Sequence, residues 1–365
     1  MERTGRFSLI QIHRGADLLS PLADIDYDVG LIFDLQQPLD IWRTTMKLAF
    51  GFIAAMGLMV SVALAADDTF LDPAKAGVDY QIQGEYLGKL GPENDQRWGA
   101  QVIALGDGTF RMVALEGGLP GDGWSRGDEQ KTADGKLVNG EVEFKTDDAV
   151  SVLRDGAIYV THEGQDVGAM KKVTRESPTL GIKPPSGATI LFDGKTADNF
   201  VRGAITEEKL LAANCESKLK LGDHRLHIEF RTPFKPKARG QGRGNSGVYI
   251  QSRYECQVLD SFGLDGKDNE CGGIYQISKP DVNMCFPPLT WQTYDMDFRA
   301  ARYKDGKKVE NARVTIKHNG FVIHENIELP HHTPGKIGEG PDDAPVYLQG
   351  HGNPVVFQNI WVVKK

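Results

Sequence analysis

Residues 245–260 read NSGVYIQSRYECQVLD, and this stretch decides the fold of the C-terminal half of the chain. Its apolar and polar residues alternate, with Ser252 as a small exception, and alternating side chains of an extended strand point to opposite faces. We therefore predict one long strand with a core face and a polar face. The core face would hold Val248, Ile250, Tyr254, Cys256 and Val258, and the polar face Tyr249, Gln251, Arg253, Glu255 and Gln257.

Two other stretches alternate in the same way, namely RLHIEFR at residues 225–231 and VYLQGH at residues 346–351. Two antiparallel sheets that pack face to face bury one face each and leave the other face open. We therefore predict an all-β sandwich of the jelly-roll type. A polar open face could bind a hydroxyl-rich ligand through directional hydrogen bonds, and an ordinary solvated sheet face is the alternative.

Length and composition limit what this protein can be. The 365 residues suffice for two domains with separate cores. The net charge of −8, without a basic stripe, argues against a nucleic-acid partner. Asp-Gly pairs are typical of hairpin turns, and three of them predict a small all-β N-terminal domain. These pairs are Asp107-Gly108, Asp134-Gly135 and Asp155-Gly156.

Composition also predicts the domain boundaries. The small β domain should span residues 66–173, and its function is not legible from the sequence. Residues 174–189 are rich in Pro, Ser and Gly and predict a linker. The sandwich should then span residues 190–365.

A secretory signal peptide is predicted at residues 46–65, MKLAFGFIAAMGLMVSVALA, which has a lysine, an apolar run and a small-x-small ending. A membrane anchor is the alternative. However, residues 1–45 carry four arginines against seven acidic residues, which opposes the positive-inside preference. We therefore predict that translation starts at Met46, that residues 1–45 come from a wrongly chosen start codon, and that the mature chain starts at Ala66. The protein would then be secreted or periplasmic, without a stable membrane anchor.

Export makes disulfide bonds possible, and all four cysteines lie in the second half of the chain. Cys271 and Cys285 flank a loop-like segment, so we predict a bond between them. Cys256 lies on the core face of its strand, which predicts a buried thiol.

Residues 260–270, DSFGLDGKDNE, are dense in oxygen ligands. Asp260, Asp265 and Asp268 are candidate ligands for a divalent metal such as calcium. The segment lacks the spacing of an EF-hand, so a solvated turn is the alternative. The sequence requires no cofactor.

Seven motifs, taken in order, closely resemble the 3-keto-disaccharide hydrolase domain family over residues 190–363. They are LFDGKT at 191–196, HIEFRTPF at 227–234, GRGNSGVYIQSRYECQVLDSFG at 242–263, ECGGIY at 270–275, LTWQTYDMDF at 289–298, HNG at 318–320 and LQGHGNPVVFQNIWV at 348–362. The resemblance implies a concanavalin-like jelly roll and secretion. It also implies cleavage of disaccharides or other glycosides whose C3 hydroxyl a partner sugar 3-oxidoreductase has oxidised to a ketone.

Such a reaction requires particular residue types. A C3 ketone acidifies the proton on C2, so a base can remove it and give an enolate, after which the group on C1 leaves and water adds. A base, donors near the enolate oxygen and an acid for the leaving oxygen are needed. The candidate catalytic residues are Glu255, Glu229 and His351, and the candidate substrate-binding residues are Arg253, Gln257, Arg231, Gln251, Tyr249, Gln349 and Trp291.

Two other functions remain open. A conventional glycosidase uses two carboxylates that flank the bond, for which Glu229 with Glu255, or Glu255 with Asp260, are candidates. A non-catalytic lectin-like module is the second possibility, because lectin-like sandwiches host both enzymes and binding proteins.

Overall fold

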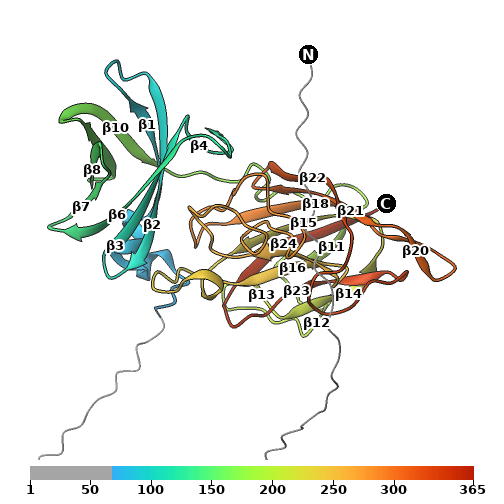
Figure 1. The fold of residues 1–365 in the computed structure, drawn as a ribbon. Helices are drawn as coiled ribbons and strands as arrows, with labels where there is room; N and C mark the ends of the chain where they lie inside the picture. Colours follow the sequence, from blue (N-terminus) through green and yellow to red (C-terminus); the bar gives the residue numbers. More distant parts are fainter. Residues whose placement is uncertain (1–67) are drawn as a thin grey trace, which may run out of the picture. The chain divides into compact units, whose positions relative to one another are not determined.

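The computed structural model describes residues 68–365, which fall in one compact unit. The predicted signal peptide, start site and upstream extension lie outside the described residues. The all-β prediction is confirmed, because the described chain forms a closed barrel followed by a two-sheet sandwich (Figure 1). No helix of the described part is long and apolar enough to cross a membrane.

The N-terminal domain is a closed eight-stranded antiparallel barrel that follows a short helix α1 (Gly77–Ile82). The barrel closes because β1 pairs with both β2 and β10. Its interior is filled by buried apolar side chains that include Tyr86, Phe110 and Phe144. The strands, in order around the barrel, are β1 (Gly84–Leu90), β10 (Gln165–Val173), β9 (Ala157–His162), β8 (Ala149–Arg154), β7 (Glu141–Lys145), β6 (Gln130–Val138), β3 (Thr109–Glu116) and β2 (Gln96–Gly106).

Two of the three predicted Asp-Gly turns are confirmed, because Asp107-Gly108 joins β2 to β3 and Asp155-Gly156 joins β8 to β9. The third is wrong. Asp134-Gly135 lies inside β6, where the Asp134 carboxylate pairs with Arg111 across the sheet. A Cβ at Gly135 would lie 2.6 Å from the backbone oxygen of Glu143, so glycine serves close packing here and not a turn.

The C-terminal domain consists of two antiparallel sheets that enclose a common core, which holds Ile228, Val248 and Cys256. One sheet has the order β11 (Thr189–Phe192), β24 (Val356–Lys364), β15 (His224–Arg231), β18 (Gln292–Arg299), β21 (Ala312–His318) and β22 (Phe321–Leu329), with β13 (Leu211–Ala212) also paired to β24. The other has the order β12 (Phe200–Val201), β14 (Cys215–Leu221), β23 (Ala344–Leu348), β16 (Ser246–Ile250) and β17 (Tyr254–Val258).

Residues 245–260 form a hairpin and not the single long strand that alternation predicted. Gln251 and Ser252 adopt left-handed backbone angles, with φ of 53° and 52°, and reverse the chain between β16 and β17. Ile250 pairs directly with Tyr254, so the loop has three residues. An odd loop length preserves the alternation across the turn, and the predicted core face is therefore correct although the strand is broken.

The predicted linker packs along the sheet that contains β15. The hydroxyl of Ser177 lies 2.6 Å from that of Thr293 on β18, and the backbone N–H of Gly181 donates to Glu229 at 2.6 Å. These contacts fasten the segment between the two domains to the outer face of this sheet.

The predicted Cys271–Cys285 disulfide is absent, because both residues are free, buried thiols in the structure. The two thiols lie close enough to interact with each other, and each has a further partner. Cys271 Sγ lies 3.2 Å from the hydroxyl of Tyr294, and Cys285 Sγ donates to the backbone oxygen of Leu259 at 3.5 Å. Cys256 is fully buried in the sandwich core, as predicted.

Candidate functional site

A polar cavity of about 210 Å³ opens on the outer face of the β16–β17 hairpin. Its wall combines side chains of the hairpin with side chains from four loops. Among residues 68–365, Glu255 is the only carboxylate and His351 the only imidazole in this wall. The lining residues are Gln241, Asn245, Tyr249, Glu255, Gln257, Asn269, Tyr275, Pro334, Gln349 and His351.

Glu255 lies on β17 directly opposite Tyr249 on β16. Its side chain folds back over Gly247, where an added Cβ would lie 2.4 Å from Glu255 Oε1. Only 4% of Glu255 is exposed, and burial raises the pKa of its carboxyl to about 7. The hydroxyl of Tyr249 opposes part of this rise. The result is a carboxyl group that exchanges protons near neutral pH.

Two loops dock on the open edge of β17 and build the wall beside Glu255. The backbone N–H of Glu255 donates to Thr333 Oγ1 at 2.9 Å, and its backbone oxygen accepts from Tyr275 N at 3.3 Å. The Tyr249 hydroxyl donates to the backbone oxygen of Pro334 at 3.0 Å. These bonds cover an edge strand and hold Tyr275 and Pro334 at the cavity.

Amide side chains form the rest of the wall. Gln257 Nε2 donates to Gln241 Oε1 at 2.9 Å, and Asn245 Nδ2 donates to the same oxygen at 2.7 Å. Gln349 Nε2 donates to the Tyr249 hydroxyl at 3.2 Å, while its Oε1 is buried without a partner among residues 68–365. A buried acceptor without a donor can take a hydrogen bond from a ligand hydroxyl.

The structure therefore brings together five of the predicted site residues, namely Tyr249, Glu255, Gln257, Gln349 and His351. Of the others, the sequence indicated Tyr275 as a residue that could stack on a sugar ring, with burial as the alternative, and it did not identify the remaining four. Asn245 lies within one of the motifs that resemble the family, and this motif is the signal that could have identified it. Gln241 and Asn269 lie in loops without periodicity, so no local signal identified them.

Arg253 and Gln251 were predicted to bind substrate, but they stabilise the hairpin turn and the loop beside it. Arg253 donates to the backbone oxygens of Gly338 and Asp342, both at 3.0 Å, and to Gln251 Oε1 at 2.9 Å. Gln251 in turn donates to the backbone oxygen of Leu221 at 2.7 Å. Neither lines the cavity, because the turn carries both side chains away from Glu255.

Glu229 belongs to the other sheet and does not reach the cavity. Its strand β15 buries Ile228 and Phe230 in the core, so Glu229 lies on the outer face of that sheet. Glu255 lies on the outer face of the opposite sheet. The whole core separates the two carboxylates, and they cannot flank one glycosidic bond.

Arg231 and Trp291, which were predicted to bind substrate, also lie outside the Glu255 cavity. Arg231 pairs with Glu208 at 2.6 Å and lies over the indole of Trp291, with 5.2 Å between the guanidinium carbon and the ring centroid. Trp291 therefore packs against an arginine of the larger sheet and contributes no stacking surface to the Glu255 cavity.

The predicted metal ligands do not converge. Asp260 is buried in a salt bridge with Arg243 at 2.7 Å, which also removes it as a second carboxylate beside Glu255. Asp268 accepts from the backbone N–H of Gln276 at 3.1 Å. Within residues 68–365, no group of three or more His, Cys, Asp or Glu side chains could hold a metal ion.

Comparisons with known proteins agree with the motifs. Residues 187–363 match the family described as the 3-keto-α-glucoside-1,2-lyase-like domain. Among curated proteins none matches the chain.

Three similar crystal structures are of Parabacteroides distasonis ATCC 8503 proteins, each provisionally described as a glycosyl hydrolase. The first is 29% identical, with a TM-score of 0.45, and the match covers 50% of this chain and 85% of that one. The second is 19% identical, with a TM-score of 0.35, and the match covers 49% of this chain and 94% of that one. The third is 20% identical, with a TM-score of 0.35, and the match covers 49% of this chain and 99% of that one. The family model thus covers almost all of the C-terminal domain, which is similar to the 3-keto-α-glucoside-1,2-lyase-like domain and so to proteins that act on carbohydrates.

Proposed function

We propose that the chain cleaves glycosides whose C3 carbon is a ketone, with Glu255 as the base. The observation that carries this proposal is a single buried carboxyl, with a pKa raised to about 7, in a polar cavity. A base is most effective when its pKa lies near the working pH. The proton that such a base would remove is the one on C2, which the adjacent ketone makes acidic.

The bonds change in a fixed order. Glu255 takes the C2 proton, and the electron pair of the C–H bond forms an enolate with the C3 oxygen. The enolate then expels the oxygen on C1, leaving a double bond between C1 and C2. His351 lines the same cavity and can protonate the departing oxygen. Water adds its oxygen to C1 and a proton returns to C2, so the net reaction is hydrolysis.

The remaining wall suits a sugar. The amides of Gln257, Asn245 and Gln349 offer directional donors and acceptors to the hydroxyls of a sugar. The sequence-predicted export would put this reaction outside the cytoplasm, where a sugar 3-oxidoreductase would supply the substrate. The proposal requires no metal.

The test is to incubate the purified chain with 3-keto-trehalose and with a 3-keto-β-glucoside, each beside its unoxidised parent. We expect release of the C1 substituent from a keto compound and none from its parent, because only the ketone acidifies C2. Binding of both forms without turnover of either would favour the lectin-like function. Turnover of the parents would indicate a conventional glycosidase.

A further inference from the structure

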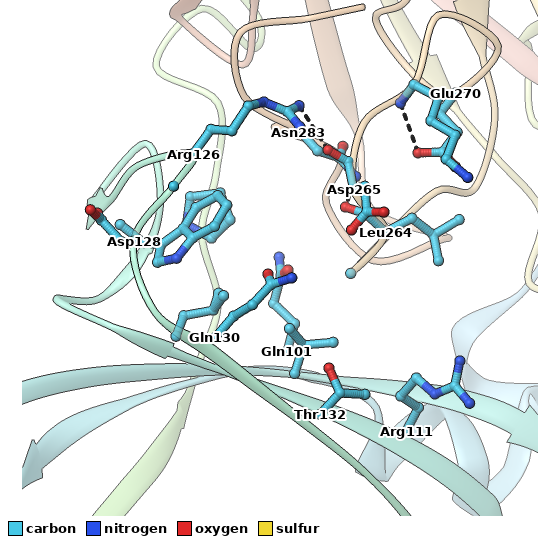
Figure 2. A pocket seen from close by; sticks show the side chains of 17 residues that line it. Gln101, Arg111, Arg126, Asp128, Gln130, Thr132, Leu264, Asp265, Glu270 and Asn283 are labelled. Carbon is cyan, nitrogen blue, oxygen red and sulfur yellow. Dashed lines mark hydrogen bonds between the residues drawn. The ribbon is translucent and has the colours of Figure 1, made fainter.

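A second cavity, of about 380 Å³, lies between the barrel and a loop of the sandwich (Figure 2). The barrel contributes the outward faces of β3 and β6, where Thr132 pairs with Val113 and Gln130 pairs with Leu115. Val113 and Leu115 belong to the same apolar cluster as the sandwich core, so barrel and sandwich pack directly beneath this cavity. Its volume is in the range that small ligands occupy, roughly 300–1,000 Å³.

The loop between β17 and β18 forms the opposite wall, and one arginine of the barrel holds it. Arg126 donates to the backbone oxygens of Asp265, Gly266, Pro280 and Asp281 at 2.8–3.2 Å. It thereby ties both arms of the loop to the barrel.

The charged groups of this wall are largely satisfied by the protein itself. Arg111 makes a two-pronged bond to Asp134 at 2.7 and 2.9 Å. Glu270 accepts from two backbone N–H groups, those of Gly266 at 2.7 Å and Lys267 at 3.0 Å. The guanidinium group of Arg126 donates its hydrogen bonds to the four backbone oxygens of the loop. Asp128 accepts from the backbone N–H of Ser125 at 2.7 Å. Asp265 and Lys267 also line the cavity and carry opposite charges.

The charges of the lining side chains sum to zero, and besides them the cavity offers neutral polar groups and one aromatic ring. Gln130 and Thr132 present an amide and a hydroxyl from one side, facing the Asp265 and Glu270 segment across the cavity (Figure 2). Trp124 of β5 (Gly123–Trp124) adds an indole, whose Nε1 is buried without a partner among the described residues. An indole face beside amides and a hydroxyl suits a sugar ring, which has apolar C–H faces and a polar rim.

The same loop lines both cavities. Glu270 faces the second cavity, while its neighbour Asn269 and also Tyr275 line the Glu255 cavity. Gln241 Nε2 donates to the backbone oxygen of Asn269 at 2.8 Å and fastens the loop on the catalytic side. A ligand in the second cavity would therefore contact the loop that forms part of the catalytic wall.

We propose that the cavity beneath Trp124 is a second carbohydrate site that binds a neutral saccharide. The choice of ligand class rests on the proposed function, because the carbohydrate chemistry of the sandwich is what favours a saccharide over other neutral polar molecules. The site gives the N-terminal domain a role, because that domain supplies most of the wall, including residues of β3, β5 and β6.

The test uses the full chain with Glu255→Gln, which removes the catalytic base and keeps bound sugars intact. Calorimetric titration with maltotriose and cellotriose should reveal a site that Trp124→Ala weakens by about tenfold or more, because stacking of a sugar ring is lost. Trp124→Phe should retain most of the affinity. Gln130→Ala, a change at an exposed strand position, provides a second test should Trp124→Ala fold poorly.

The control is turnover of a small 3-keto-glucoside by Trp124→Ala with Glu255 intact, which should stay near the unmodified level. The second site would be overturned if Trp124→Ala and Gln130→Ala bound saccharides as tightly as the protein without these changes. It would also be overturned if no saccharide bound at all. Trp124-dependent binding in a protein that turns over no keto sugar would overturn the proposed function and leave the second site standing.

Discussion

Glu255 and Glu229 look equivalent in sequence and differ in chemistry. Each follows an apolar residue on an alternating strand, lies on the outer face of its sheet and is buried, with exposures of 4% and 0%. Burial dominates at Glu255 and raises the pKa to about 7. Burial acts in the same direction at Glu229, but hydrogen bonds from His227, Asn359, Gln358 and Gly181 outweigh it and lower the pKa.

The difference lies in what covers each carboxylate. Glu229 Oε1 accepts from Gly181 N at 2.6 Å and from Asn359 Nδ2 at 2.7 Å, and it lies 3.3 Å from His227 Nε2. Burial alone would lower the pKa of His227, but its bonds to Asp295 and Glu229 raise it instead. A buried carboxylate with such partners is a stable anion, whereas one at the wall of a cavity with a single hydroxyl neighbour can exchange protons.

The largest expected effect comes from Glu255→Gln. This change keeps the shape of the side chain and removes its basicity, so turnover of a 3-keto glycoside should fall by a factor of about 100 or more. Steady-state kinetics measure the loss, and binding of the unoxidised sugar should change little. Unaltered turnover would mean that Glu255 is not the base.

Glu229→Gln should instead reduce stability, by about 1–3 kcal/mol, because it leaves buried donors without their acceptor. Denaturant unfolding measures the loss, and Glu208→Gln is the matched control because Glu208 is an exposed partner of Arg231, for which a smaller effect is expected. Turnover per folded molecule should stay unchanged in Glu229→Gln. A hundredfold loss of turnover there would give Glu229 a catalytic role.

The loss in Glu229→Gln should depend on pH. The lowered pKa of Glu229 contributes stability that is present above its ordinary pKa of 4.5 and is lost as the pH falls through the folded-state pKa. The raised pKa of His227 contributes stability that is present below 6.5 and is lost as the pH rises through the folded-state pKa. The stability difference between the unmodified protein and the variant should therefore be greatest between pH 4.5 and 6.5.

The pH dependence of turnover provides a third, smaller effect. A general base must be ionised, so kcat/KM should rise about tenfold per pH unit on the acidic side and level off near the pKa of Glu255, which is about 7. A rate profile with 3-keto-trehalose measures this limb. A profile that is flat through the neutral range would contradict the raised pKa.

Tyr249→Phe should have the smallest effect. The Tyr249 hydroxyl lowers the pKa of Glu255, so its removal should move the acidic limb of the profile to higher pH and reduce turnover a few-fold at neutral pH, an order-of-magnitude expectation. Tyr347→Phe is the control, because Tyr347 pairs with Tyr249 across the sheet but does not line the cavity. A shift to lower pH in Tyr249→Phe would contradict the role given to its hydroxyl.

Alternation of residue types determined which side chains face the core. Val248, Ile250, Cys256 and Val258 are buried as predicted, and this holds although residues 251–253 are a turn. Alternation also brought Tyr249, Glu255 and Gln257 to one outer face, since the pattern of a strand reports local burial and survives a three-residue loop.

The pKa of the carboxyl group on that face, and the cavity around it, depend on the tertiary structure. The pKa of a carboxyl depends on groups that come from anywhere in the chain, such as Gly181 at Glu229 or Tyr249 at Glu255. The loops that carry Asn269 and Pro334 to the cavity have no period, so their contacts could not be deduced from local sequence. The sequence by itself determined an all-β fold and a polar sheet face, because burial patterns are local. Which of two similar glutamates has a raised pKa was decided by the folded surroundings, because desolvation and hydrogen bonding depend on groups from other parts of the chain.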